Sequence, residues 1–177
     1  MRRFVMVISF LVISLLWDVH IVSAQTQFAE AGVQKLEVPV EAPDFTLKVL
    51  GGGKISKREL RGKIIVLNFF TSWCPVCQNE FLSFDKLSKE FKDKDIMFLK
   101  VAVKAKEKDL IRYRKFAPIL MDDNGSTAKA YGVGVGHHET FFINREGKII
   151  GKTFAEEDWT STSMKNLVKH LLNVEDS

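Results

Sequence analysis

The two cysteines of the chain, Cys74 and Cys77, flank two residues in the stretch Trp73-Cys74-Pro75-Val76-Cys77. An apolar run, Ile64 to Phe70, precedes the pair and a helical pattern follows it, so the first sulfur should lie at a helix N-terminus. Unpaired N–H groups and the helix dipole favour a thiolate at that position. The spacing predicts a redox-active Cys-x-x-Cys dithiol with Cys74 as the attacking nucleophile.

The helix after the motif should organise the rest of the site. Pro75 suits the first helical position, because its missing N–H would have no intrahelical partner there. Cys77 begins an apolar stripe that continues at three- and four-residue steps to Phe91, so we expect Cys77 to be the shielded, resolving cysteine. Glu80 lies three residues further on, on the same side of the helix as the sulfurs, and is expected to move protons for thiol exchange.

A structural disulfide or half of a zinc site are the alternatives for a cysteine pair. A lone bridge that closes so short a loop constrains the unfolded chain little, and zinc usually requires four ligands. The redox interpretation is therefore favoured.

Length and composition indicate one domain with an N-terminal extension. The chain has 177 residues, of which 46% are hydrophobic and 27% charged, values typical of a globular protein. The formal net charge is only +4, which gives no reason to expect a nucleic-acid partner.

The first 24 residues read as a targeting segment. A charged start, Met1-Arg2-Arg3, is followed by an apolar stretch and by Val22-Ser23-Ala24, which resembles a cleavage site. We expect residues 1–24 to be a signal peptide, with an uncleaved membrane anchor as the alternative. Either one predicts a periplasmic or extracytoplasmic location, and the anchor would also tether the domain to the membrane. Residues 25–41 would be a spacer or edge structure, and residues 42–174 the folded domain.

The pattern of apolar runs and turn residues predicts the order of elements in that domain. The expected elements are a strand pair about Gly51–Gly53, a short helix over Ser56–Leu60, strands over Lys63–Phe70, Ile96–Val103 and Ile119–Met121, a helix to Tyr131, a hairpin over Thr140–Asn144 and Lys148–Thr153, and a terminal helix over Asp158–Val174. We expect Trp159, on that last helix, to be a packing residue outside the site.

The chain resembles thioredoxin-like thiol-disulfide oxidoreductases of the TlpA/ResA/CcmG type. The blocks that carry this likeness are Ala42–Phe45, Gly62-Lys63, Val66–Phe70, Trp73–Cys77 with Glu80, and Glu139–Asn144. The resemblance implies an α/β thioredoxin fold, with a mixed central sheet flanked by helices and an extra N-terminal β-hairpin. It also implies that the protein reduces a disulfide-bonded protein substrate and is itself reduced by an upstream membrane or periplasmic thiol reductant. Apocytochrome c, in cytochrome c maturation, is one candidate substrate.

Among the departures from the family pattern, two bear on the site directly. Asn68 stands where a buried acid often lies, which gives Glu80 more weight as the proton acceptor. His138 occupies the position of a cis-proline that faces the Cys-x-x-Cys pair, and the peptide before it is expected to be trans.

By the resemblance, Trp73, Pro75, His138, Glu139 and Thr140 are the expected substrate-binding or tuning residues. For His138, three roles remain open: an exposed loop residue, a donor that tunes the thiolate, or a metal ligand together with Cys74 and Cys77. No cofactor is expected unless that metal set forms.

Two rival functions follow from the same residues. One is a metal carrier or sensor that uses the two cysteines and His138. The other is a thiol peroxidase that uses Cys74 alone.

Overall fold

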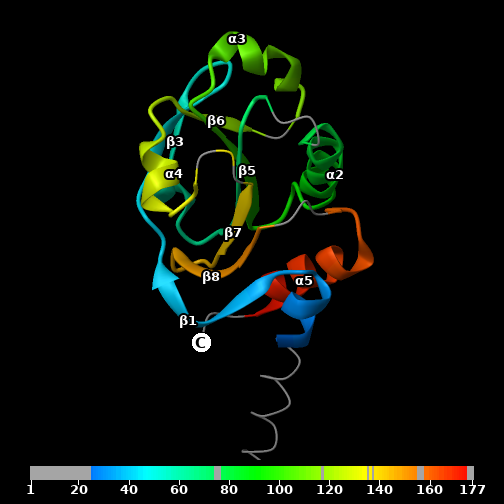
Figure 1. Ribbon diagram of the computed structural model, residues 1–177. Helices are drawn as coiled ribbons and strands as arrows, with labels where there is room; N and C mark the ends of the chain where they lie inside the picture. The colour runs from blue at the N-terminus through cyan, green and yellow to red at the C-terminus, as the bar shows by residue number, and fades with distance from the viewer. Residues whose placement is uncertain are drawn as a thin grey trace, which may run out of the picture.

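A computed structural model describes residues 25–73, 77–116, 118–134, 136, 138–154 and 158–174, with only the backbone described for residues 77–79. Its centre is one eight-stranded sheet in the order β1-β8-β7-β4-β5-β6-β2-β3 (Figure 1). The inner strands β4, β5 and β6 run parallel, and the remaining neighbours pair antiparallel. This mixed sheet with helices on both faces is the predicted fold class.

The elements follow the predicted order closely. The strands are β1 (Gln34–Glu41), β2 (Thr46–Val49), β3 (Lys54–Ser56), β4 (Ile64–Phe70), β5 (Ile96–Val103), β6 (Ile119–Asp122), β7 (Glu139–Ile143) and β8 (Lys148–Thr153). The helical elements are η1 (Lys57–Leu60), α2 (Cys77–Glu90), α3 (Glu107–Leu110), η2 (Ile111–Tyr113), α4 (Ser126–Ala130) and α5 (Thr162–Asn173).

The inner strands β4 and β5 are buried on both faces, which is why their sequences are nearly continuous apolar runs. Because successive side chains of a strand alternate, even-numbered residues of these strands face α2 and α5, and odd-numbered residues face α4. Figure 1 shows α2 and α5 on one side of the sheet and α4 on the other. The sheet thus separates two cores.

Residues 25–41 are edge structure, the second of the two predicted alternatives, and not a spacer. Residues 25–30 are helical, and β1 pairs antiparallel with β8. Phe28 is buried against Gly151 of β8 so closely that a Cβ at Gly151 would lie 2.6 Å from its ring. This segment is therefore packed into the sheet rather than linking it to something else.

The predicted N-terminal hairpin is confirmed as β2 and β3, which extend the opposite edge of the sheet. Ser56 caps η1: its Oγ accepts a hydrogen bond from the Glu59 backbone N–H, and the Glu59 carboxylate accepts one from the Ser56 backbone N–H. This reciprocal capping box ends the hairpin and starts the turn that leads into β4.

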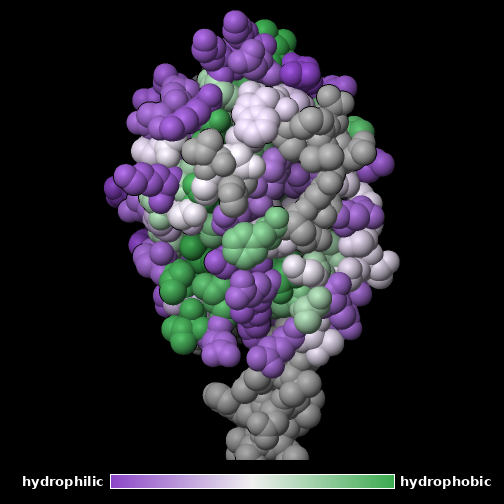
Figure 2. All heavy atoms as spheres, viewed as in Figure 1, coloured by the Kyte–Doolittle hydropathy of each residue, from purple (hydrophilic) through white to green (hydrophobic). Residues whose placement is uncertain are grey.

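The surface differs between the two ends of the molecule. Hydrophilic side chains gather over α3 at the top of Figure 2, and hydrophobic side chains gather lower down. Val38 and Val40 of edge strand β1 are exposed, and Pro39 between them lacks the N–H that a further strand would need for pairing. None of the helices among the described residues is long and apolar enough to cross a membrane.

Candidate functional site

The strand-to-helix junction of the Cys-x-x-Cys motif lies between β4 and α2, as the sequence predicts. Helix α2 begins at Cys77, whereas Cys74, Pro75 and Val76 lie outside the described residues, as does the side chain of Cys77. The roles of these cysteines, the predicted helix start at Pro75 and a Cys-Cys-His metal set therefore stay predictions. What the structure does place is a cluster of polar side chains beneath the start of α2.

Three neighbouring strands bring one polar residue each to the same level of the sheet beneath the start of α2. Asn68 of β4 is paired with Lys100 of β5 on one side and with Thr140 of β7 on the other. Directly paired residues point to the same face of a sheet, so the three side chains lie in a row on the α2 face. Asn68 links the row: its Nδ2 donates to Thr140 Oγ1 at 2.8 Å, and Lys100 Nζ donates to its Oδ1 at 2.8 Å.

Glu80, in the first turn of α2, points down onto this row and is only 3% exposed. Its Oε1 accepts hydrogen bonds from Asn68 Nδ2 at 2.9 Å and from Trp159 Nε1 at 3.2 Å, and Lys100 Nζ lies 3.8 Å away. Its Oε2 faces His138, whose Nδ1 is 3.8 Å away. One oxygen is thus held from below, and the other faces the loop that carries His138.

The surroundings of Glu80 favour its charged form. Burial raises the pKa of Glu80, but the interactions with His138, the positive charge of Lys100 and the hydrogen bond from Trp159 outweigh burial and hold that pKa below its ordinary value. The position of Glu80 near the N-terminus of α2 acts in the same direction. Glu80 is therefore a buried carboxylate that is ionised at neutral pH.

His138 is half-buried, with 19% of its side chain exposed, and it belongs to the same cluster. The 3.8 Å between His138 Nδ1 and Glu80 Oε2 is longer than a short hydrogen bond. Of the three roles predicted for His138, the exposed loop residue is wrong. Thiolate tuning and metal ligation both depend on cysteine side chains outside the described part of the chain and stay predictions.

Trp73, which directly precedes the motif in sequence, contacts Gly136, two residues before His138. The Trp73 side chain is 69% exposed, and its ring lies against Gly136, where an added Cβ would be 3.4 Å from Cη2. Gly136 has a φ of +83°, a backbone conformation that L side chains rarely adopt. The glycine thus lets the loop before His138 pass close under an exposed indole at the edge of the motif.

Glu139 and Thr140 lie on opposite faces of β7, although the sequence groups them. Thr140 is paired with Asn68 and belongs to the cluster, whereas Glu139 is paired with Phe69, on the α4 face. Both are buried. The structure thus brings Thr140 to Glu80 and places Glu139 on the other side of the sheet.

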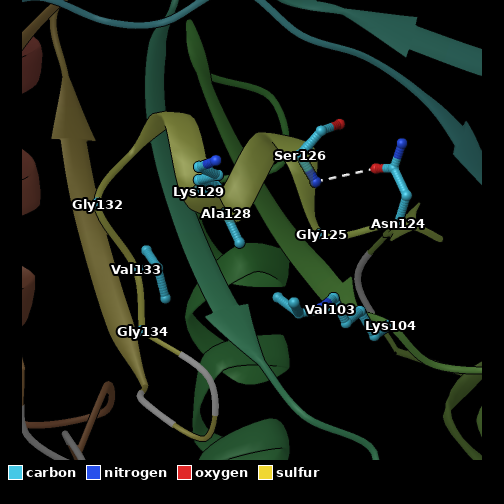
Figure 3. A pocket seen from close by; sticks show the side chains of 10 residues that line it. All are labelled: Val103, Lys104, Asn124, Gly125, Ser126, Ala128, Lys129, Gly132, Val133 and Gly134. Atoms are coloured by element: carbon cyan, nitrogen blue, oxygen red, sulfur yellow. Dashed lines mark hydrogen bonds between the residues drawn. The ribbon is translucent and has the colours of Figure 1, made fainter.

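A pocket of about 540 Å³ opens beside the same loop, on the α4 side of the sheet (Figure 3). It is lined by Val103 at the end of β5, by the turn that precedes α4, by α4 itself and by Gly132–Gly134, which lead toward His138 in sequence. Figure 3 shows Ala128 and Val133 pointing into it and Lys104 at its rim.

Two residues of the cluster were missed or misjudged by the sequence analysis. Lys100 is hidden in the apolar run Ile96–Val103, and the signal that could have found it is a lone charge inside a strand that is buried on both faces. Trp159 is fully buried as expected, but its indole N–H also binds Glu80, so it is not outside the site. It precedes α5, which begins at Thr162 with Ser161 as its cap.

Residues 38–152 match the AhpC/TSA family. Among curated proteins, the chain is 31% identical over 130 residues to "Thiol-disulfide oxidoreductase ResA" of Bacillus thuringiensis subsp. konkukian, a match that covers 70% of this chain and 73% of the relative. It is 35% identical over 127 residues to "Thioredoxin-like protein YneN" of Bacillus subtilis, covering 68% of this chain and 71% of the relative.

Solved structures agree on the fold. A thiol:disulfide interchange protein of the thioredoxin family from Chlorobium tepidum superposes with a TM-score of 0.68 at 24% identity, covering 78% of this chain and 99% of the other. A DsbF homologue from Corynebacterium diphtheriae superposes with a TM-score of 0.64 at 16% identity, covering 78% of this chain and 90% of the other.

Proposed function

Because this chain belongs to the AhpC/TSA family and is a thioredoxin-like thiol-disulfide oxidoreductase of the TlpA/ResA type, we propose that it reduces disulfides of extracytoplasmic proteins with Cys74 and Cys77. The observation that carries the mechanism is Glu80, a buried carboxylate three residues after Cys77 whose pKa is held low.

The proposed reaction transfers two electrons from the dithiol to the substrate. The Cys74 thiolate attacks one sulfur of the substrate disulfide, a mixed disulfide forms, and one substrate thiolate leaves. Cys77 then attacks the sulfur of Cys74, which releases the second substrate thiolate and leaves a Cys74–Cys77 disulfide. An upstream thiol reductant returns the pair to the dithiol.

Glu80 acts in the second step as the proton acceptor for Cys77. A thiol that resolves a mixed disulfide needs a base, because the thiolate and not the thiol is the nucleophile. Glu80 is ionised at neutral pH and belongs to the same first turn of α2 as Cys77. The proton that it accepts passes to the leaving substrate thiolate.

His138 tunes this base. Its imidazole faces the Glu80 oxygen that Asn68 and Trp159 leave free, and its interactions with Glu80 lower the pKa of that carboxyl. Proline, which the family pattern has in this place, offers neither a charge nor a donor.

The N-terminal sequence supports an extracytoplasmic location. Residues 1–24 carry the charged start, apolar stretch and small-residue end of a signal peptide, and an uncleaved form would tether the domain to the membrane. Protein disulfides persist in such compartments. The substrates would be disulfide-bonded proteins, with apocytochrome c as the first to test.

The test is the pH dependence of single-turnover reduction of a disulfide-bonded peptide by the reduced protein. We expect the parent rate to rise with pH as Glu80 ionises. In Glu80→Gln the resolving step should slow on the order of 100-fold near neutral pH, because a general base contributes that much or more. Glu37→Gln, the same change at an exposed position of β1, should leave the profile unchanged.

A Glu80→Gln profile that matches the parent would remove Glu80 from the mechanism. A parent that reduces no disulfide peptide would overturn the proposed function itself. The rival functions have their own tests. Stoichiometric metal in protein purified without chelator would favour the carrier, and peroxide turnover that is lost in Cys74→Ser but survives in Cys77→Ser would favour the peroxidase.

A further inference from the structure

We propose that Lys100, in the middle of β5, is a positioning residue for the thiol chemistry: it supplies the buried positive charge that keeps Glu80 ionised and, through Asn68, fixes which Glu80 oxygen faces His138. This inference rests on the proposed role of Glu80 and adds the device that sets its charge state.

The register of three strands places Lys100 under the helix that carries the motif. Asn68 lies beside it on β4 and bonds both partners, accepting from Lys100 Nζ at 2.8 Å and donating to Glu80 Oε1 at 2.9 Å. The amide therefore works as a bridge whose orientation Lys100 determines. An ammonium can only donate, so Asn68 must present its oxygen to Lys100 and its N–H groups to Glu80 and Thr140.

Lys100 is buried too deeply to be a solvated charge that happens to lie nearby. Its side chain is 1% exposed, and its ammonium lies over the rings of Phe81 at 4.2 Å and Phe84 at 4.4 Å. Helix α2 provides the opposite charge, that of Glu80, and β4 provides only the neutral Asn68. Among the described residues, Glu80 is the one charged group in contact with Lys100.

Burying the charge of a lysine costs free energy unless a nearby opposite charge compensates for the lost solvation. Burial lowers the pKa of Lys100 to about 8, and the negative charge of Glu80 opposes that shift. At neutral pH both groups are charged and each stabilises the ionised form of the other. The other groups that act on Glu80 are His138 across the cluster and the indole of Trp159.

Without the lysine charge, Glu80 would face burial with less compensation, and its pKa would rise. A larger fraction of Glu80 would then be protonated at mildly acidic pH and unable to accept the Cys77 proton. The acid limb of the reduction rate would move to higher pH, whereas the attack by Cys74 does not use this base.

The experiment is a titration of Glu80 by carbon-13 NMR of its side-chain carboxyl in the oxidised protein, with the signal assigned by its loss in Glu80→Gln. In Lys100→Met we expect the Glu80 midpoint to rise by about one pH unit, and the acid limb of single-turnover reduction to rise equally. Lys94→Met removes the same net charge from an exposed turn and should move neither.

Lys100→Gln separates charge from hydrogen bonding. Its amide can still donate to Asn68 but carries no charge, so it should shift the Glu80 midpoint as Lys100→Met does. A Glu80 midpoint that stays at the parent value in Lys100→Gln or in a folded Lys100→Met would overturn the proposal. The NMR readout needs no substrate, so it tests the Lys100 charge even if the parent were to reduce no disulfide peptide.

Discussion

The two faces of β4 and β5 show how one pair of strands serves two purposes. On the α4 face, the strands present only apolar side chains, and Phe69 packs there against Tyr131 and Phe141 with ring centroids 5.2 and 5.8 Å apart. On the α2 face, the apolar rows are interrupted at one level by Asn68 and Lys100. Apolar packing stabilises the fold on both faces, whereas the charge state of the site should depend on the second face alone.

The largest expected effect is a loss of stability from the apolar face. Phe69 is fully buried, so Phe69→Ala removes apolar contact and leaves a cavity. We expect the free energy of unfolding to fall by about 3–5 kcal/mol, measured by chemical denaturation. Phe154→Ala, which removes a half-exposed ring, should lower the free energy of unfolding much less. The comparison between the faces would fail if Phe69→Ala shifted the pH profile of reduction as far as Glu80→Gln does.

The elements of the fold could be predicted because each is signalled within its own stretch of sequence. The apolar runs of β4 and β5 and the three glycines between β2 and β3 all predict what the structure shows. Strand β1 was harder to predict, because its side chains are mostly exposed and its place is fixed by pairing with β8, far along the chain.

The candidate site was predictable only where its residues are close in sequence. Glu80 follows from its spacing to Cys77, but the Lys100–Asn68–Thr140 row depends on the register of three strands that are distant in the chain. From the sequence, Asn68 indicated only that the buried acid of the family pattern is absent. In the structure, its side-chain amide donates a hydrogen bond to Glu80, the acid that α2 supplies instead. Trp159 reaches Glu80 from just before α5, a contact that no local pattern encodes.

A smaller effect should be a pH dependence of the free energy of unfolding that arises from Lys100 on the α2 face. Since the folded-state pKa of Lys100 is about 8, below the ordinary value of 10.5, the unfolded chain binds a proton between these values that the native protein does not. Stability rises with pH wherever the unfolded state holds more protons. The parent should therefore gain stability relative to Lys100→Met as pH rises from about 8 to 10.5, on the order of 1–3 kcal/mol.

The measurement is the free energy of unfolding of both oxidised proteins across that range, taken as a difference so that the other lysines cancel. Lys94→Met is the control and should give a flat difference. A flat difference for Lys100→Met as well would mean that Lys100 titrates as an exposed lysine does, contrary to its burial.

The smallest expected effect comes from the indole that reaches Glu80. Trp159→Phe removes the 3.2 Å hydrogen bond to Oε1 but keeps a ring against Phe84, whose centroid is 4.9 Å away. Because Asn68 still donates to Oε1 and Lys100 still supplies the charge, we expect the Glu80 midpoint to rise by about 0.5 pH unit, less than in Lys100→Met. The carboxyl NMR titration measures it. Phe142→Leu changes the packing around Trp159 and keeps the donor, so it should leave the midpoint in place. If instead Trp159→Phe raised the midpoint more than Lys100→Met, the hydrogen bonds and not the lysine charge would set the charge state of this face.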